Sequence, residues 1–270
     1  MILMLLASLS FAQDDALQNT VKDKEKLKAE KPESSLSAQL GGALAAGNTA
    51  AYNLSLGLNA SHKWDQNRFQ ATAGALFGQS VSDADGNGIL SEAERDAGYV
   101  TNQQQLLADT RYDRFIGERN SVYVLAGVLI DPFAGYKSRS HEQIGYSRVL
   151  VDTEDTDLVA EIGFDWAQEN YVDTDPPQDP TYKDIFAARA MLGFKHVFNE
   201  AVSFEDTFEV YPNVVELNDV RVMNNASLAA KLSEKLGFKT SYGLRFDNVP
   251  VEGFRKADHA LTASLVISIL

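Results

Sequence analysis

The feature that most constrains this chain is a regular alternation of apolar and polar residues, which begins near Ser35 and continues to the end of the sequence. In one segment the apolar residues are Leu158, Ala160, Ile162, Phe164 and Trp166. Between them lie Glu161 and Asp165, which would fall on the opposite face of a β-strand. An α-helix, with about 3.6 residues per turn, would scatter both sets around its circumference. The chain is therefore predicted to be all-β.

Segments of this kind number about twelve, an even count that is typical of bacterial outer-membrane barrels. We expect strands at 35–45, 49–63, 69–80, 100–115, 122–131, 141–151, 158–169, 184–198, 203–211, 220–232, 236–247 and 259–270. Longer connections fall at 81–99, 132–140, 170–183, 212–219 and 248–258, and short turns lie between them. This order predicts an antiparallel transmembrane β-barrel over residues 35–270, with short periplasmic turns and longer outer loops. We expect it in the outer membrane of a Gram-negative bacterium.

A secreted, soluble β-sandwich that acts as a binding protein is an alternative, because its strands also alternate. Strands of about 10 to 14 residues are long for a sandwich but fit a tilted strand that crosses a membrane. Aromatic residues also recur near the expected strand ends, as an interfacial girdle requires. They are Tyr52, Trp64, Phe69, Tyr99, Phe115, Trp166, Tyr171, Tyr211 and Phe254. Strand length and aromatic placement favour the membrane barrel.

The composition is compatible with a barrel although it resembles that of a soluble acidic protein. The mean hydropathy is −0.22, but lipid-facing and lumen-facing residues of a barrel cancel in such an average. Beyond the N-terminus, no stretch offers the ~18 consecutive apolar residues that a spanning helix needs. The net charge of −14 comes without a basic stripe, which argues against a nucleic-acid partner.

The first 34 residues have a different character. Residues 1–12 form an apolar run that ends in small residues before Gln13, which predicts a signal peptide cleaved after Ala12. Residues 13–34 are rich in charges of both signs and contain almost nothing apolar. Such a segment cannot bury a core, so we expect a periplasmic tail or linker.

If the apolar faces contact lipid, the charged residues of the strands point into the lumen. These residues are Asp109, Arg111, Asp113, Glu161, Asp165, Arg189, Lys195, Glu205, Glu209, Lys239, Arg245 and Asp247. Acidic and basic strands interleave, so cross-strand ion pairs are available. The sequence leaves two outcomes open: a closed polar core in a structural barrel, or a narrow aqueous channel.

One connection matches a calcium-binding motif. Residues 83–94 read DADGNGILSEAE and satisfy every constrained position of the twelve-residue EF-hand loop. The predicted Ca²⁺ ligands are Asp83, Asp85, Asn87, Ile89 through its carbonyl, Ser91 and Glu94. No second loop is paired with it, so we expect a structural site of weak affinity, on the order of 10⁻⁴–10⁻³ M. A merely solvated acidic loop is the alternative.

Several short motifs suggest a family. Gly47-Asn48-Thr49, the segment Arg111 to Phe115, the segment Phe208 to Pro212 and the segment Tyr242 to Phe246 resemble the YdiY-like family of salt-induced outer-membrane proteins. The resemblance covers most of residues 35–270 and implies an outer-membrane β-barrel of undefined activity, with no catalytic residues to carry over. The calcium-like loop looks like an insertion relative to that family's pattern.

An outer-leaflet lipid-modifying enzyme is the remaining alternative. The four histidines are His62, His141, His196 and His259, and none lies in a recognisable triad or G-x-S-x-G motif. We interpret each as a surface or interface residue and expect no catalytic residues, no enzyme and no cofactor besides Ca²⁺. Outer-membrane lipid and the barrel assembly machinery are the expected partners.

Overall fold

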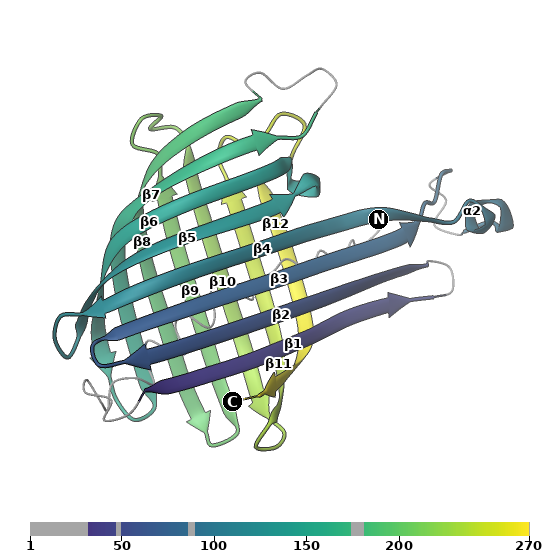
Figure 1. Cartoon of the computed structure of the whole chain (residues 1–270). Helices are drawn as coiled ribbons and strands as arrows, with labels where there is room; N and C mark the ends of the chain where they lie inside the picture. The colour runs from purple at the N-terminus through teal and green to yellow at the C-terminus, as the bar shows by residue number, and fades with distance from the viewer. Residues whose placement is uncertain (1–31, 47–49, 86–89, 174–180, 270) are drawn as a thin grey trace.

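The computed structural model describes residues 32–46, 50–85, 90–173 and 181–269, and it is built almost entirely of β-strands (Figure 1). The strands are β1 (Glu33–Ala45), β2 (Ala51–Trp64), β3 (Asn67–Val81), β4 (Tyr99–Phe115), β5 (Asn120–Asp131), β6 (Tyr136–Asp152), β7 (Thr156–Tyr171), β8 (Tyr182–Asn199), β9 (Val202–Pro212), β10 (Val220–Lys231), β11 (Leu236–Asp247) and β12 (Ala257–Ser268). Two short helical pieces accompany them, α2 (Glu92–Asp96) and the 3₁₀ turn η2 (Pro132–Ala134). No helix among the described residues is long and apolar enough to cross a membrane.

The twelve strands form one closed barrel in which each strand pairs antiparallel with its sequence neighbours and β1 pairs with β12. This confirms the predicted fold and strand number. One predicted connection is wrong: residues 132–140 were expected to form a long loop, but β6 already begins at Tyr136. The start of β6 was not recognised because this segment, which includes Lys137, Arg139 and His141, lacks the alternating apolar residues that mark the other strands.

Alternation along each strand separates an apolar outside from a polar inside. On β7, Ile162 is 64% exposed on the outer face, whereas its neighbour Glu161 is 2% exposed on the inner face. The same division holds for Phe208 and Glu209 on β9. Burial is thus inverted relative to a soluble protein, because charged residues are enclosed and large apolar residues face outward.

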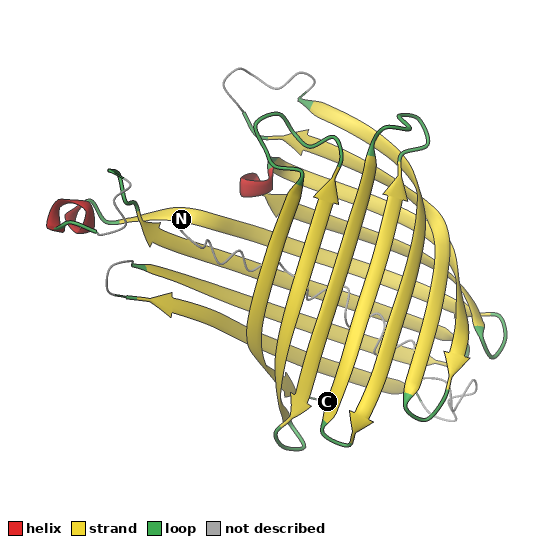
Figure 2. Cartoon of the chain, turned by 180° about the vertical axis from the view of Figure 1, so that it is seen from behind, coloured by secondary structure: helices red, strands yellow, loops and turns green. Residues whose placement is uncertain are grey.

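The two ends of the barrel differ (Figure 2). One end carries short turns such as 65–66, 116–119 and 200–201, and we call it the short-turn end. The other carries the longer connections, including η2, α2 and residues 248–256, and we call it the long-loop end. In both views β1 to β4 extend past the rest of the barrel at the end that carries α2.

Part of the predicted aromatic girdle is wrong. Tyr171 and Tyr211 are 7% and 8% exposed and donate their hydroxyls to Glu169 and Glu209, inside the barrel. Phe115 lies beneath the guanidinium of Arg68, 5.4 Å from ring centroid to Cζ, on the same inner side. Other aromatics at strand ends do lie outside, for example Tyr52 and Tyr99, whose ring centroids are 5.5 Å apart. Position near a strand end does not fix the face, which depends on residue parity.

Candidate functional site

The inside of the barrel is crossed by ion pairs between strands that are not neighbours. Arg111 on β4 donates from Nη2 to Glu161 Oε1 on β7 at 2.7 Å, although β5 and β6 lie between these strands. The same guanidinium bonds Asp113 at 2.8 Å, and Asp113 also accepts from Arg68 on β3 at 3.0 Å. All four side chains are at most 6% exposed. A bridge that skips two strands fills interior space, so the lumen narrows here.

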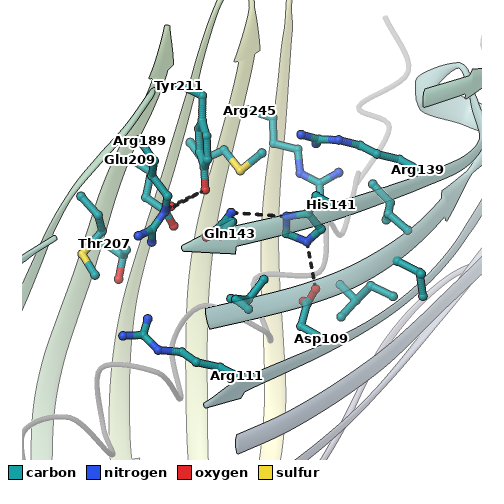
Figure 3. Close-up of a pocket in the computed structure, with 16 residues that line it drawn as sticks. Asp109, Arg111, Arg139, His141, Gln143, Arg189, Thr207, Glu209, Tyr211 and Arg245 are labelled. Atoms are coloured by element: carbon teal, nitrogen blue, oxygen red, sulfur yellow. Dashed lines mark hydrogen bonds and ion pairs between the residues drawn. The ribbon is translucent and has the colours of Figure 1, made fainter. Parts of the chain in front are cut away.

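Arg189 on β8 extends this chain of charges. Its Nη1 donates to Glu161 at 2.7 Å and its Nε donates to Glu209 on β9 at 2.6 Å. Glu209 also accepts from the hydroxyl of Tyr211, as the close-up shows (Figure 3). Glu161 is therefore shared by two arginines. We call the six connected residues the ion-pair belt: Arg68, Asp113, Arg111, Glu161, Arg189 and Glu209.

Tyr123 on β5 holds the two central arginines of the belt together. Its ring centroid is 4.1 Å from Cζ of Arg111 and 5.6 Å from Cζ of Arg189, which places both in cation–π range. Its hydroxyl accepts from Arg189 Nη1 at 2.6 Å. The side chain reaches β8 because Gly145 and Gly163 leave space on β6 and β7. A Cβ on Gly145 would lie 2.5 Å from the Tyr123 ring, and one on Gly163 would lie 2.9 Å from the hydroxyl.

A second cluster of charges lies nearer the long-loop end. Glu169 on β7, with its side chain fully buried, accepts from Arg221 Nη2 at 3.1 Å and from the Tyr171 hydroxyl at 2.9 Å. Arg139 Nε is 3.2 Å from the same carboxylate. Arg221 also reaches Asp247 on β11 at 3.1 Å. The four groups tie β6, β7, β10 and β11 together, again across strands that are not adjacent.

His141 lies inside the barrel, which corrects its interpretation as a surface or interface residue. Its Nε2 is 3.2 Å from Asp109 Oδ1 on β4 (Figure 3). Its Nδ1 is 3.3 Å from Asp165 Oδ1 on β7. Gly127 on β5 makes the first contact possible, since a Cβ there would lie 1.9 Å from Asp109 Oδ1. The imidazole thus contacts carboxylates on both sides and belongs to the lumen network.

Cavities approach these charges from both ends of the barrel. A vestibule of about 860 Å³ opens at the long-loop end and is lined by Phe133, Arg245 and Lys256, among others. Below it, a cavity of about 160 Å³ shares Arg139 and Arg245 with the vestibule and reaches Arg111 and Arg189 of the belt. At the short-turn end, a cavity of about 490 Å³ reaches inward to Lys195 and Lys239. Belt residues thus line the innermost cavity reached from the long-loop end, whereas Lys195 and Lys239 line the cavity at the short-turn end.

The structure brings together three of the six predicted calcium ligands. One carboxylate oxygen from each of Asp83, Asp85 and Glu94 lies within 4.8 Å of the other two. Ser91 caps α2, and Glu94 accepts from the backbone nitrogens of Ser91 at 2.8 Å and Ala84 at 2.7 Å. These hydrogen bonds, those from Ser91 first, lower the pKa of Glu94 to about 2. Asn87 and Ile89 lie outside the described residues.

The calcium-like loop is anchored to the barrel at one point. Leu90 is 7% exposed and packs with Ala50 and Val81, which flank β2 and β3. The loop thus begins at the end of β3 and returns against it before α2. This contact places the three carboxylates at the tip of the extended strands.

The sequence identified most charges of the lumen but not how they connect. The inward direction of Arg111, Glu161, Arg189 and Glu209 is confirmed by their burial. The bridges across non-neighbouring strands and the role of Tyr123 were missed, because strand alternation gives no distance across a lumen. Gly127, Gly145 and Gly163 were available signals, since glycine inside a strand often marks a close approach.

An apolar exterior, a charged interior and closed antiparallel pairing define the class of this protein as a porin-like β-barrel. Within that class, the chain belongs to the family DUF481, proteins of unknown function, whose profile matches residues 38–269. No curated protein matches the sequence.

Several solved structures of low identity resemble this chain, and the one with a TM-score of 0.50 shares the fold. The NanC porin aligns with a TM-score of 0.50 and 12% identity, over 87% of this chain and 100% of that chain. The COG4313 outer membrane channel from Pseudomonas putida F1 gives a TM-score of 0.48 and 11% identity, over 90% and 98%. The KdgM porin gives 0.45 and 7%, over 87% and 99%. At these identities the likeness concerns the fold.

Proposed function

We propose that this protein is an outer-membrane barrel of a Gram-negative bacterium whose lumen is a narrow, water-filled passage limited by the ion-pair belt. The observation that carries the proposal is the pair of water-accessible spaces that enter from the two ends and meet the charged layers between them. A purely structural barrel would need no vestibules of about 860 and 490 Å³.

The outer face supports a membrane location. Leu56, Val128, Ile144 and Leu192 are among large apolar side chains that are at least 47% exposed on different strands. In water such a surface would promote aggregation, whereas in a bilayer it contacts acyl chains. Outer-membrane lipid and the machinery that inserts barrels are thus the partners we propose.

Two measurements on the refolded full chain test this function. In detergent, the folded barrel should migrate differently on a gel before and after boiling. In planar bilayers, it should give small, steady conductance steps. Full solubility without detergent would contradict the membrane location, and a heat-modifiable barrel that never conducts would leave a closed scaffold in place of a channel.

We propose no enzymatic activity. His141, the histidine closest to the lumen cavities, contacts carboxylates, while Ser140 donates to Gln168 and Ser138 accepts from Asn170. These contacts leave His141 without a serine partner. Ser34 Oγ lies 2.8 Å from His62 Nδ1, but this pair is exposed and lines none of the lumen cavities described above. Absence of lipase and deacylase activity in the refolded protein is the expected result.

We further propose that the loop 83–94 binds Ca²⁺ weakly and so orders the tip of β3 and β4. The match to the EF-hand pattern and the convergence of Asp83, Asp85 and Glu94 support it. Calorimetric titration should detect binding at millimolar Ca²⁺ that Asp83→Ala abolishes. Asp155→Ala, in a turn between β6 and β7, is the matched control and should bind normally.

The narrower assignment to YdiY-like salt-induced proteins also stays a proposal. It is supported by the short motifs at Arg111 to Phe115 and Phe208 to Pro212. Both lie in the structure on strands that carry the belt, β4 and β9. Protein abundance that rises when cells are grown at raised salt is the expected observation.

A further inference from the structure

The barrel is closed by the pairing of β1 with β12, which we call the seam, and this pairing is unusually short. β1 and β12 pair over Ser37–Gly41 and Ser264–Ser268, five residues of each strand, whereas every other pairing of adjacent strands involves at least nine. Beyond Gly41, β1 continues to Ala45 paired with β2 alone. Beyond Ser264, β12 extends back to Ala257 paired with β11 alone. Among the described residues, the two strands therefore diverge toward the long-loop end.

The last paired position is unusually tight. A Cβ on Gly41 would lie 2.5 Å from Ser55 Oγ and 2.9 Å from the carbonyl oxygen of Ala263. From there the strands part at a run of small residues, Gly42 and Ala43 on one side and Ala263 on the other. Among the described residues, these small side chains leave space between the two strand edges.

A cavity of about 170 Å³ occupies this position, and residues from both faces of the wall line it. Its lining includes Ala43, Ser55 and Thr262, which share the inner face of their strands with buried residues. It also includes Leu261 and Ala263, which point outward. A cavity lined from both faces at an unpaired seam connects the lumen side with the outer surface.

The lining favours an uncharged occupant, since it combines small and apolar residues such as Leu76 and Leu261 with the neutral polar side chains of Asn53, Ser55, Thr240 and Thr262. None of the residues that line this cavity carries a charge, in contrast to the cavities at the two ends and the centre of the lumen. Outside, the opening is flanked by Leu44 and Leu261, which are 80% and 56% exposed. A cavity of roughly 150 Å³ is large enough for a molecule the size of benzene, so this one has room for the end of a hydrocarbon chain.

Aromatic residues place the opening at the edge of the apolar band. Tyr242, which is paired with Leu261, donates to His259 Nδ1 or accepts from it at 2.7 Å. On the other side, Leu44 is paired with Tyr52, which lies in the aromatic pair with Tyr99. Tyrosines of this kind mark the interface between hydrocarbon and headgroups.

We propose that the β1–β12 seam is a lateral binding site for a hydrocarbon chain of a membrane lipid, which enters from the bilayer between Leu44 and Leu261 and ends at the lumen side. The site rests on the proposed membrane location. It differs from the charged lumen in position and in chemistry, since it takes an apolar chain and uses no ion pair.

Fluorescence quenching by lipids with bromine on their acyl chains tests the site. The chain contains no cysteine, so single cysteines can be labelled cleanly. The test position is Ala43→Cys at the inner side of the seam. Two controls lie on one strand, β10: Met223→Cys, which lines the lumen cavities, and Leu228→Cys, which is 48% exposed on the outer face.

The site predicts that the label at Ala43→Cys loses its fluorescence in brominated vesicles about as strongly as the label at Leu228→Cys, while the label at Met223→Cys does not. Filling the cavity with Ala263→Phe should remove the quenching at Ala43→Cys. Ala108→Phe, at an outward alanine on β4, should leave it unchanged.

Three outcomes would overturn the site. Quenching at Ala43→Cys as weak as at Met223→Cys, with Leu228→Cys quenched, means that no chain enters the seam. Quenching that survives Ala263→Phe, or that appears equally at Met223→Cys, places the lipid elsewhere. If Leu228→Cys itself is not quenched, the barrel does not lie in the bilayer, and the proposed function fails together with the site.

Discussion

Two parts of the barrel wall differ in the side chains that they bury on their inner faces. The inner faces of β3 to β10, which we call the charged wall, bury the belt residues and many further charges such as Asp165, Glu169, Lys195 and Arg221. The inner faces of β12, β1 and β2, which we call the neutral wall, bury Gln39, Ser55, Asn59, Thr262 and Ser264. The one buried charge on those three strands is Lys63, next to the turn at the end of β2.

As a result, side chains cross-link the strands of the charged wall, whereas the neutral wall is held mainly by backbone pairing. In the charged wall, arginines such as Arg111 and Arg189 each bind carboxylates on two strands, so the strands are fixed by side chains as well as by backbone pairing. In the neutral wall, side chains are short and the β1–β12 pairing covers five residues. We infer that stability and constriction are properties of the charged wall, and that lateral access is a property of the neutral wall.

The largest expected effect comes from removing the shared cation of the charged wall. Arg189→Ala deletes the partner of Glu161, Glu209 and the Tyr123 hydroxyl, which leaves buried acceptors short of a donor. Breaking a buried ion pair from one side costs about 3–5 kcal/mol. The free energy of unfolding, from denaturant titration in lipid vesicles, should fall by about this amount.

Gln39→Ala is the matched change in the neutral wall and should cost about 1 kcal/mol, the centre of the range for single substitutions. If both variants lose the same stability, the distinction between the two walls is wrong.

A smaller effect should follow from crowding the space below Tyr123. Gly145→Ala puts a Cβ 2.5 Å from the Tyr123 ring, and overpacking of this kind costs about 1–3 kcal/mol. Gly237→Ala, on β11, is the control because its nearest neighbour would be 3.5 Å away. A thermal melt of both variants checks the prediction, and a Gly145→Ala barrel as stable as Gly237→Ala would show that Tyr123 does not need its observed position.

The fold was largely predictable from the sequence, but the side-chain contacts inside the barrel were not. Alternation in segments such as 158–166 fixed the faces of strands, because parity alone decides which side a residue takes. It could not show that Arg111 meets Glu161 across two intervening strands, since that distance depends on the curvature of the closed barrel. Tyr171 and Tyr211 have a different cause: their position near strand ends placed them in the girdle, although parity, which the sequence does show, puts them inside.

The calcium-like loop was found from its spacing, because the ligands are local in sequence. Convergence of Asp83, Asp85 and Glu94 agrees with the motif, and calcium binding itself stays a prediction. The β1–β12 seam gave no such signal, since it joins residues at opposite ends of the chain.

The smallest expected effect is on the pKa of Glu94, which lies outside both walls in the capping box of α2. Because hydrogen bonds lower the pKa of Glu94 from 4.5 to about 2, its contribution to the loop is present above pH 4.5 and is lost as the pH falls toward 2. Ser91→Ala removes a side-chain hydrogen bond and should raise this pKa toward its ordinary value. A carboxyl carbon titration by NMR in both proteins measures the shift, and an unchanged pKa in the variant would show that Ser91 does not hold the carboxylate.

Single-channel conductance tests the central claim, that the charged wall limits the lumen, most directly. Arg111→Ala/Glu161→Ala removes three of the five ion pairs of the belt without changing the net charge. Gln39→Ala/Ser264→Ala shortens two side chains of the neutral wall. We predict that the first double variant conducts several times more than the original protein and that the second conducts about the same. Equal conductance in all three barrels, or a gain confined to the neutral-wall variant, would contradict the account.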